Sequence, residues 1–337
     1  MKNYEKPDFI KFDTIKIRTK KEYFKKTIMI FNQNFNPRNG KLTGMYYSSK
    51  NDNNIPFDLY IAVSEKNNSM TIEFSSKILR DKYPELITKD TFKQCLDNLN
   101  KLGICEIDAK AVSKDCYFQE VDVTSDTQMT LTEEILNTLN TLVANYRRWR
   151  WERYENSGIT FTKDVKSKDC KESLKIYNKE KEIALPKNEK FLSQLDNPES
   201  VKQAFAGITR FETTLSSMDK IKKYLDIPDT HVDNVFNSKA NPVLLQFNKI
   251  FGTEECNVNL TRKSYDEYTM TEILKLYDNN LKQIEMNLRY NKCYSTNSRT
   301  GLSDRMKKYK ELKERLLNET PYNSTVLSDI RKKLQAQ

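Results

Sequence analysis

The sequence predicts an α+β protein, with a mainly antiparallel sheet, helices packed on one face of that sheet, and a helical C-terminal region. Segments that alternate apolar and polar residues, as half-buried strands do, occur throughout the first two thirds of the chain. Segments with the helical spacing of apolar residues lie between some of these strands and fill the chain after about residue 225. The chain has only seven glycines and no glycine-rich phosphate loop, which argues against a nucleotide-binding fold.

The first elements are predicted from periodicity and from end signals. "FIKFDTIKIRT" alternates and predicts a strand, and "PFDLYIAVSEKNNSMTIEFSSKIL" predicts two strands joined by a polar turn. "TKDTFKQCLDNLNKLGI" predicts a helix that begins after the capping residue Thr88 and ends at Gly103. "CYFQEVDVTSD" predicts another strand, and "LTEEILNTLNTLVANYRRW", residues 131–149, predicts a long helix.

The middle of the chain repeats this alternation. Strands are predicted around residues 159–161, at 174–178 and in "GITRFETTL", and "MDKIKKYL" predicts a short helix. Beyond it, "YTMTEILKLYDNNLKQIEMNLR", "SDRMKKYKELKERLLNE" and "STVLSDIRKKLQAQ" are all helical in pattern. We therefore predict two parts, residues 1–225 and a helical region 226–337.

Charge and cysteine content limit the function classes. The net charge of +10 favours a polyanionic partner, with nucleic acid first and a membrane surface second. The six cysteines form no Cys-x-x-Cys pair and the chain has one histidine, so no zinc-binding spacing is present. No apolar run approaches the roughly 20 residues that cross a membrane. We expect a cytoplasmic protein with no membrane partner.

"LKIYNKEKEI", residues 174–183, places a tyrosine among lysines. In a strand, Leu174 and Ile176 would face the core, while Lys175, Tyr177 and Lys179 would share the other face. Cations beside a phenol favour the phenolate, and the same cations can hold a phosphate. The stretch is therefore a candidate active site, in which Tyr177 is the nucleophile and the lysines hold the substrate phosphate. The alternative is an edge strand with a solvated lysine face.

Carboxylates lie on two other predicted strands. Asp122 in "FQEVDVTSD" and Glu212, beside Arg210, in "ITRFETTL" would each lie on the face opposite their apolar neighbours. Carboxylates persist in such strands when they are paired with a cation or bound to a metal. Oxygen ligands suit Mg²⁺ or Mn²⁺, which can polarise a scissile phosphate. The alternative is a surface ladder between Arg210 and Glu212, with an exposed Asp122.

"NYRRWRWERY", residues 145–154, contains both tryptophans of the chain and four arginines. Arginines contact phosphates and aromatic rings stack on unpaired bases, so the segment is a candidate nucleic-acid-binding site. The alternative places the tryptophans in the core on one strand face. The candidate DNA-binding arginines are Arg147, Arg148, Arg150 and Arg153.

Together, "FDTIKI", "VDVTSD", "LKIYNKEKEI" and "TRFETTL" resemble the phage and plasmid replication initiators of the gene II/gene X family. They are also similar, more distantly, to the replication-transfer initiators of rolling-circle plasmids. The resemblance covers about residues 10–220. It implies an enzyme that acts in the cytoplasm of a bacterial host. Such an enzyme binds an origin, nicks one DNA strand with a tyrosine, stays joined to the 5′ end and later rejoins the ends.

The resemblance also implies roles for particular residues. Tyr177 is implied as the nucleophile, with Lys179 beside it, and Asp122 and Glu212 are implied as ligands of Mg²⁺ or Mn²⁺. Asp126 and Glu182 are weaker candidate ligands, and Arg210 and Lys175 are candidate DNA contacts. The implied partners are origin duplex or hairpin DNA, single-stranded DNA, and a host helicase and polymerase.

The chain departs from the pattern of related nickases in one respect, and two other functions are open to it. Related nickases often hold their metal through a His-hydrophobe-His motif, which a chain with a single histidine cannot form, so only acidic ligands fit. A non-catalytic origin-binding protein and an RNA-binding or structural protein remain open as alternatives. Tyr146 and Tyr154 are candidate second nucleophiles.

Overall fold

The computed structural model describes residues 10–52, 54–144, 148–154, 157–163, 172–252, 264–293, 299–319 and 321–336. The chain forms two compact units. The first unit comprises residues 1–130 and 165–245 with residue 337, and the second comprises residues 131–164 and 246–336. These units differ from the predicted division after residue 225, because the second unit includes an internal segment of the chain as well as the C-terminal helices.

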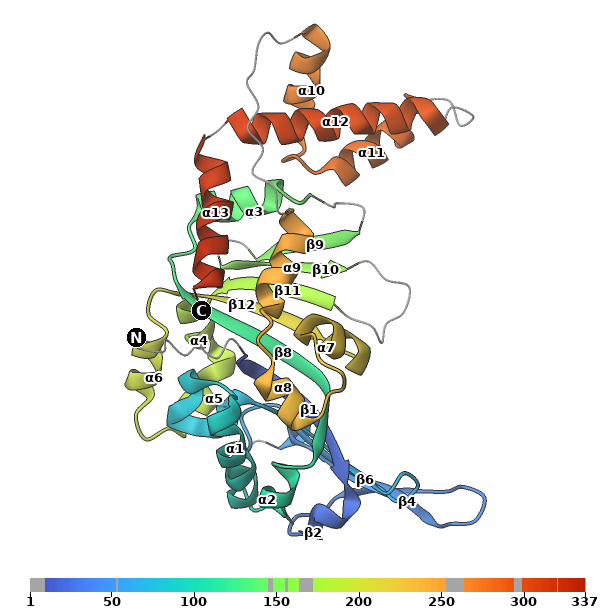
Figure 1. The fold of residues 1–337 in the computed structure, drawn as a ribbon, viewed down its shortest axis with the longest axis vertical. Coiled ribbons are helices and arrows are strands. Elements are labelled where there is room, and N and C mark those ends of the chain that lie inside the picture. The colour runs from blue at the N-terminus through green and yellow to red at the C-terminus, as the bar shows by residue number, and fades with distance from the viewer. Residues whose placement is uncertain are drawn as a thin grey trace. The chain divides into compact units, whose positions relative to one another are not determined.

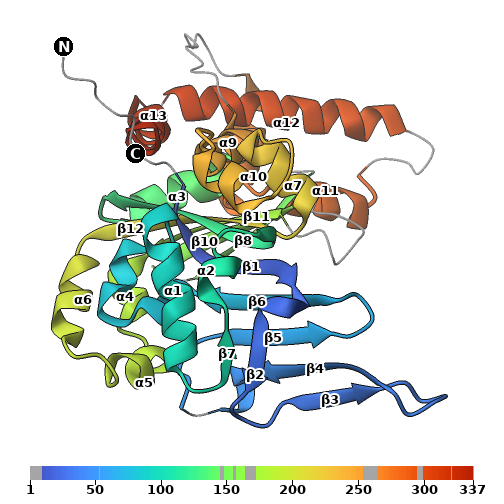
Figure 2. The same cartoon turned by 60° about the horizontal axis from the view of Figure 1, so that its bottom comes forward.

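A large antiparallel sheet organises the first unit and confirms the predicted α+β class. Eight of its strands follow one another in the order β3-β4-β5-β6-β1-β8-β12-β11 (Figures 1 and 2). Each neighbouring pair in this order is antiparallel. The strands are β1 (Phe12–Lys20), β3 (Asn32–Phe35), β4 (Leu42–Ser48), β5 (Leu59–Ser64), β6 (Ser69–Ser75), β8 (Cys116–Gln128), β11 (Glu172–Asn178) and β12 (Ile208–Leu215). β2 (Phe24–Thr27) and β7 (Cys105–Ile107) form a separate pair.

Helices of the first unit begin where the sequence supplies capping groups. Thr88 and Thr91 form a capping box at the start of α1, and Ser217 caps α7. The α-helices are α1 (Lys89–Lys101), α2 (Ala109–Val112), α4 (Lys179–Ile183), α5 (Glu189–Leu192), α6 (Pro198–Ala204), α7 (Met218–Leu225) and α8 (Val232–Asn237). The 3₁₀ segments are η1 (Lys21–Tyr23), η2 (Ser49–Asn51), η3 (Ser76–Glu85) and η4 (Pro186–Asn188).

The two faces of this sheet differ in chemistry. One face carries buried apolar side chains such as Ile15, Val123 and Phe211, in agreement with the predicted alternation. Helices α1 and α8 pack on this face, where rings of Phe92 and Phe236 contact the ring of Phe118 on β8. The opposite face of the same strands carries polar residues that were predicted to form the site, such as Asp122, Tyr177 and Glu212.

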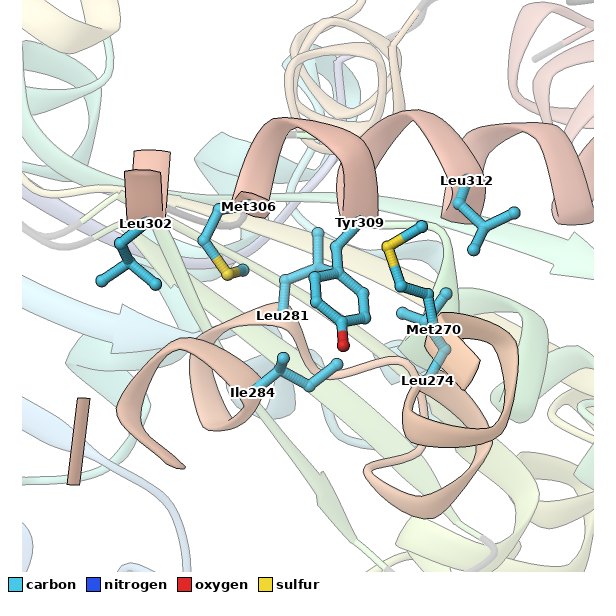
Figure 3. Close-up of a cluster of buried hydrophobic side chains, with 8 residues drawn as sticks. All are labelled: Met270, Leu274, Leu281, Ile284, Leu302, Met306, Tyr309 and Leu312. Atoms are coloured by element: carbon cyan, nitrogen blue, oxygen red, sulfur yellow. The ribbon is translucent and has the colours of Figure 1, made fainter. Parts of the chain in front are cut away.

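The second unit holds the C-terminal helices and a hairpin. Its helices are α3 (Glu133–Thr141), α10 (Tyr265–Leu276), α11 (Leu281–Tyr290), α12 (Arg299–Glu319) and α13 (Pro321–Gln335), and its strands are β9 (Trp149–Tyr154) and β10 (Gly158–Lys163). Helix α9 (Pro242–Phe251) contains the boundary between the units. Eight buried residues of α10, α11 and α12 form a core cluster (Figure 3). They are Met270, Leu274, Leu281, Ile284, Leu302, Met306, Tyr309 and Leu312.

The predicted long helix over residues 131–149 is wrong in its second half. Helix α3 begins after the capping residue Thr132 and ends at Thr141, and Trp149 begins strand β9. In β9 the buried or half-buried Trp149, Trp151 and Arg153 alternate with the exposed Arg150, Glu152 and Tyr154, which is a strand period and not a helical one. Among the described residues, no helix has both the length and the apolar composition needed to span a membrane.

Candidate active site

The four sequence segments that carry the resemblance form four consecutive strands of the sheet. They lie on β1, β8, β12 and β11, in this order across the sheet. The registers place Asp122 opposite Thr214, Glu212 opposite Lys175, and Tyr177 opposite Arg210. Side chains of directly opposed residues share a face of the sheet. The polar side chains of the separate segments therefore collect on one face, opposite to α1 and α8.

Tyr177 and Lys175 share one carboxylate. The Tyr177 hydroxyl donates a hydrogen bond to Oε2 of Glu212 at 3.0 Å, and the Lys175 ammonium bonds to Oε1 of the same side chain. Glu212 is only 4% exposed, so its charge is almost fully withdrawn from water and held by these neighbours. The phenolic proton of Tyr177 thus already points at a group that can accept it.

The pKa of Tyr177 is shifted in the direction opposite to the sequence prediction. Burial raises the pKa of this phenol well above its ordinary value, and the charge of Glu212 raises it further. The lysines do not reverse this shift because their charges are directed at carboxylates: Lys175 pairs with Glu212 and Lys179 pairs with Glu182. Attack by Tyr177 therefore needs a proton acceptor at the site, since a free phenolate is disfavoured there.

Lys179 does not lie on the strand face where the alternation placed it. Asn178 ends the strand, because its side chain accepts a hydrogen bond from the backbone of Lys181 and so caps α4. Lys179 becomes the first residue of that helix and is only 2% exposed. Its ammonium donates to the Tyr83 hydroxyl and to Glu182, each at 2.6 Å, and lies 5.8 Å from the centre of the Tyr177 ring.

Glu182 is held by two lysines. Burial raises the pKa of this carboxyl, but the charges and hydrogen bonds of Lys179 and Lys187 outweigh burial and hold the pKa at about 2. Lys187 lies 2.9 Å from Oε1 of Glu182, whereas Lys179 contacts Oε2. Burial conversely lowers the pKa of Lys179. Glu182 is therefore an ionised carboxylate that neutralises the buried end of Lys179.

Arg210 is the most deeply buried charge of the site. Its side chain is fully buried, and it forms two hydrogen bonds of 2.7 Å to the carboxylate of Asp126 and one of 3.0 Å to Asp13. The rings of Tyr83 and Phe205 lie 5.9 and 5.3 Å from its guanidinium carbon. Arg210, a candidate DNA contact, and Asp126, a candidate metal ligand, are thus engaged in a bidentate ion pair with each other.

Asp13 and Tyr83 also belong to the site, although neither was predicted from the sequence. The pairing of β1 with β8 shifts between Phe12 and Thr14, so Asp13 is an extra residue whose carboxylate meets Arg210, with Ser76 as a further hydrogen-bond donor. The available signal was an Asp within the apolar alternation of "FDTIKI". Tyr83 had no sequence signal, because it comes from the 3₁₀ segment η3 far from the motif strands in the sequence.

Asp122 is a second carboxylate of the site and lies near Glu212, the hydrogen-bond partner of Tyr177. It accepts a hydrogen bond of 2.6 Å from Thr214, and burial together with the nearby charge of Glu212 raises its pKa to about 7. The registers make Asp122 and Glu212 diagonal neighbours on β8 and β12. Diagonal cross-strand positions are roughly 7–8 Å apart, within reach of one ion between two side chains.

These carboxylates differ in how well they fit a divalent metal. Asp126 is held by Arg210 and Glu182 by two lysines. Glu212 pairs with Lys175, but its charge also raises the pKa of Asp122, and a cation between Asp122 and Glu212 would relieve this repulsion. Within the described ranges, no three His, Cys, Asp or Glu side chains gather as a metal cluster. Mg²⁺ commonly takes only one or two carboxylates and completes its shell with water and phosphate, so the Asp122–Glu212 pair fits that ion.

Asp122→Asn is expected to change how stability depends on pH. The pKa of Asp122 is raised on folding, so the carboxyl stabilises the fold below its unfolded pKa of about 4 and this contribution is lost as pH rises to about 7. In EDTA, the variant should gain free energy of unfolding over the wild type between these pH values, by about 2 kcal/mol once solvent screening is allowed for. Urea unfolding across the pH range measures this. Asp97→Asn, at an exposed carboxyl, is the control, and parallel profiles for both variants would contradict the assignment.

The candidate DNA-binding arginines of residues 145–154 belong to the second unit. Arg148 and Arg150 are exposed at the start of β9, while Arg153 pairs with Glu133 and donates to Asn137. Arg147, like Tyr146, lies outside the described residues. Trp149 is buried, and Trp151 packs against the core cluster of Figure 3. The two tryptophans are therefore packing residues of this unit.

No protein-family model matches the chain, and no curated protein matches it significantly.

Proposed function

We propose that the protein is a metal-dependent DNA nickase and strand transferase that initiates rolling-circle replication. The observation that carries this proposal is the Tyr177–Glu212 hydrogen bond, next to Asp122, on the four adjacent strands that bear the motifs. A phenol that is hydrogen-bonded to a buried carboxylate can act as a nucleophile, with the carboxylate as its proton acceptor. A surface tyrosine on a solvated lysine face would have neither the burial nor this partner.

The nicking step can be assigned atom by atom. The Tyr177 oxygen attacks a phosphorus of the DNA backbone while its proton passes to Oε2 of Glu212. The new bond joins the phenolic oxygen to phosphorus, and the bond from phosphorus to the 3′ oxygen breaks. The 3′ oxygen leaves with the bonding electrons and takes a proton from water. The products are a 5′-phosphotyrosine and a free 3′-hydroxyl, and the reverse attack by a 3′-hydroxyl rejoins the strand.

Asp122 and Glu212 would hold Mg²⁺ or Mn²⁺, and Asp126 and Glu182 are the weaker candidate ligands. When bound, the ion would supply Lewis-acid stabilisation of the charge that grows on the phosphate oxygens. Lys175, which is half-exposed beside Glu212, can turn from that carboxylate to a phosphate oxygen of the bound strand. Arg210 and Lys179 keep their carboxylate partners and act by fixing the position of the Tyr177 ring.

A non-catalytic nucleic-acid-binding protein is the second candidate. The exposed Arg148 and Arg150, and the net charge of +10, favour it as much as they favour a nickase. The Tyr177–Glu212 bond has no role in that candidate.

Incubation with supercoiled plasmid separates the two candidates. A nickase converts a plasmid that carries its origin to the open-circle form when Mn²⁺ or Mg²⁺ is present and leaves it supercoiled in EDTA. A plasmid library with varied inserts removes the need to know the origin sequence. Retention of every plasmid in the supercoiled form, together with metal-independent binding, would favour the non-catalytic candidate.

Binding to DNA is expected to weaken steeply with salt. Each phosphate contact made by Lys or Arg releases counterions, so the logarithm of affinity falls linearly with the logarithm of salt concentration. The net charge of +10 and the exposed Arg148 and Arg150 motivate this expectation. Fluorescence anisotropy with labelled DNA between about 50 and 200 mM salt measures the slope. An affinity that stays constant over this range would contradict it.

A further inference from the structure

We propose that the β3–β4 hairpin is an arm that enters a groove of duplex DNA about one helical turn from the nicking site. The arm is defined as residues 32–44, that is β3, the turn after it and the first residues of β4. Figure 2 shows it at the end of the strand order away from β11, extending beyond its neighbours. The inference rests on the proposed function only in that both take DNA as the partner.

The first support is charge. Residues 23–51 contain five basic residues and no Asp or Glu. Lys25 and Lys26, before the arm, lie near acidic residues of the fold, whereas Arg38 and Lys41 at its tip have no acidic partner among the described residues. Two exposed cations on a projecting turn suit a polyanion.

The second support is the side-chain chemistry of the arm. Five of its residues carry amide side chains, which can pair with the edges of bases. Asn32, Gln33, Asn34 and Asn39 are exposed, and Asn36 is half-buried. Phe35 is 55% exposed and lies directly opposite the exposed Leu42. The two form an exposed apolar cross-strand pair next to the turn that carries the two cations. A two-stranded ribbon also has the width that the major groove admits.

The third support is that hydrogen bonds within the turn hold the backbone of the tip. The side chain of Asn36 accepts a hydrogen bond from the backbone of Arg38 at 2.9 Å, and that of Asn39 accepts one from Lys41 at 3.1 Å. Gly40 has φ +63°, a conformation that closes the turn and that other residues adopt only with strain. The positions of the two cations are thus set by the turn, which lowers the entropy cost of binding.

The arm and the candidate active site lie on one sheet. The polar face that carries Asp122 and Glu212 continues across β1, β6 and β5 to β4, where Asn32 pairs with Tyr46 on that face. Seven strand intervals of about 4.8 Å separate β3 from β11, or about 34 Å, which is roughly one turn of duplex. We therefore expect the arm to contact duplex about one helical turn from the phosphate that Tyr177 attacks.

The test replaces the two tip cations and compares duplex with single-stranded DNA. The arm variant is Arg38→Ala with Lys41→Ala, and the control is Lys93→Ala with Lys101→Ala on α1, which removes the same charge from exposed residues of a helix on the other face. For the arm variant, affinity for a mixed-sequence duplex should fall roughly tenfold, and the salt slope should fall by about 2. Cleavage of a single-stranded oligonucleotide with Mn²⁺ should fall far less.

Three outcomes would overturn the inference. One is a duplex affinity and salt slope equal to those of the wild type, as an arm that binds another protein would give. Another is an equal loss in the control, which would make the effect one of net charge. The third is an equal loss on single strands. If the wild type binds duplex but never cuts DNA, the nicking function fails while the comparison of arm and control still decides this inference.

Discussion

Tyr177→Phe is expected to eliminate both the nick and the covalent protein–DNA adduct. The substitution keeps the ring that packs beside Lys179 and removes the one atom that would attack phosphorus. It also removes a hydrogen bond to Glu212, which costs stability by only about 0.5–1.5 kcal/mol, so the variant should fold and bind DNA as the wild type does. Denaturing gels with labelled DNA measure the adduct, and circular dichroism with binding measures the fold.

Tyr154→Phe is the matched control for this substitution, because Tyr154 lies exposed at the end of β9 and was a candidate second nucleophile. It should keep full adduct formation in a first turnover. If Tyr177→Phe nicks DNA at the wild-type rate, Tyr177 is not the nucleophile, and Tyr154 and Tyr146 become the candidates.

Glu212→Gln is expected to slow adduct formation by about a hundredfold or more while leaving most DNA binding intact. The amide is nearly the same size as the carboxylate, but it cannot take the proton from Tyr177, and a lost general base typically costs 10²–10⁴ in rate. Binding should persist because it rests mainly on phosphate contacts elsewhere. Single-turnover kinetics on a labelled strand measure the rate.

Glu73→Gln is a close control, since Glu73 lies on β6 and pairs with Lys16 at 3.1 Å. A metal titration then separates the two roles proposed for Glu212. Rescue of the variant by high Mn²⁺ indicates a lost ligand, whereas a rate that no metal concentration restores, but that rises with pH, indicates a lost proton acceptor. A wild-type rate at ordinary metal concentration would contradict both roles.

The strands and their faces could be predicted from the sequence because a strand has a period of two. Leu174 and Ile176 are buried as predicted, and Lys175, Tyr177 and Glu212 meet on the opposite face. The order of strands in the sheet was not predictable from that period. Only the fold shows that β1, β8, β12 and β11 are consecutive.

The parts that sequence reasoning missed depend on contacts between distant segments. Lys179 was placed on the strand face because the strand was extended past Asn178, which in fact caps a helix. The burial of Arg210 follows from its register opposite Asp126 and from the rings of Tyr83 and Phe205. Asp126 and Tyr83 lie far from Arg210 in the sequence. The raised pKa of Tyr177 has the same origin, since burial outweighs the nearby cations.

The most direct test of the central claim is to map the covalent adduct. The wild-type protein is incubated with Mn²⁺ and labelled origin-containing DNA, the DNA is digested, and the protein is cleaved into peptides for mass spectrometry. The account predicts a nucleotide phosphate on the peptide that contains Tyr177, bonded to its phenolic oxygen. An adduct on any other residue, or nicked DNA with no protein attached, would contradict it.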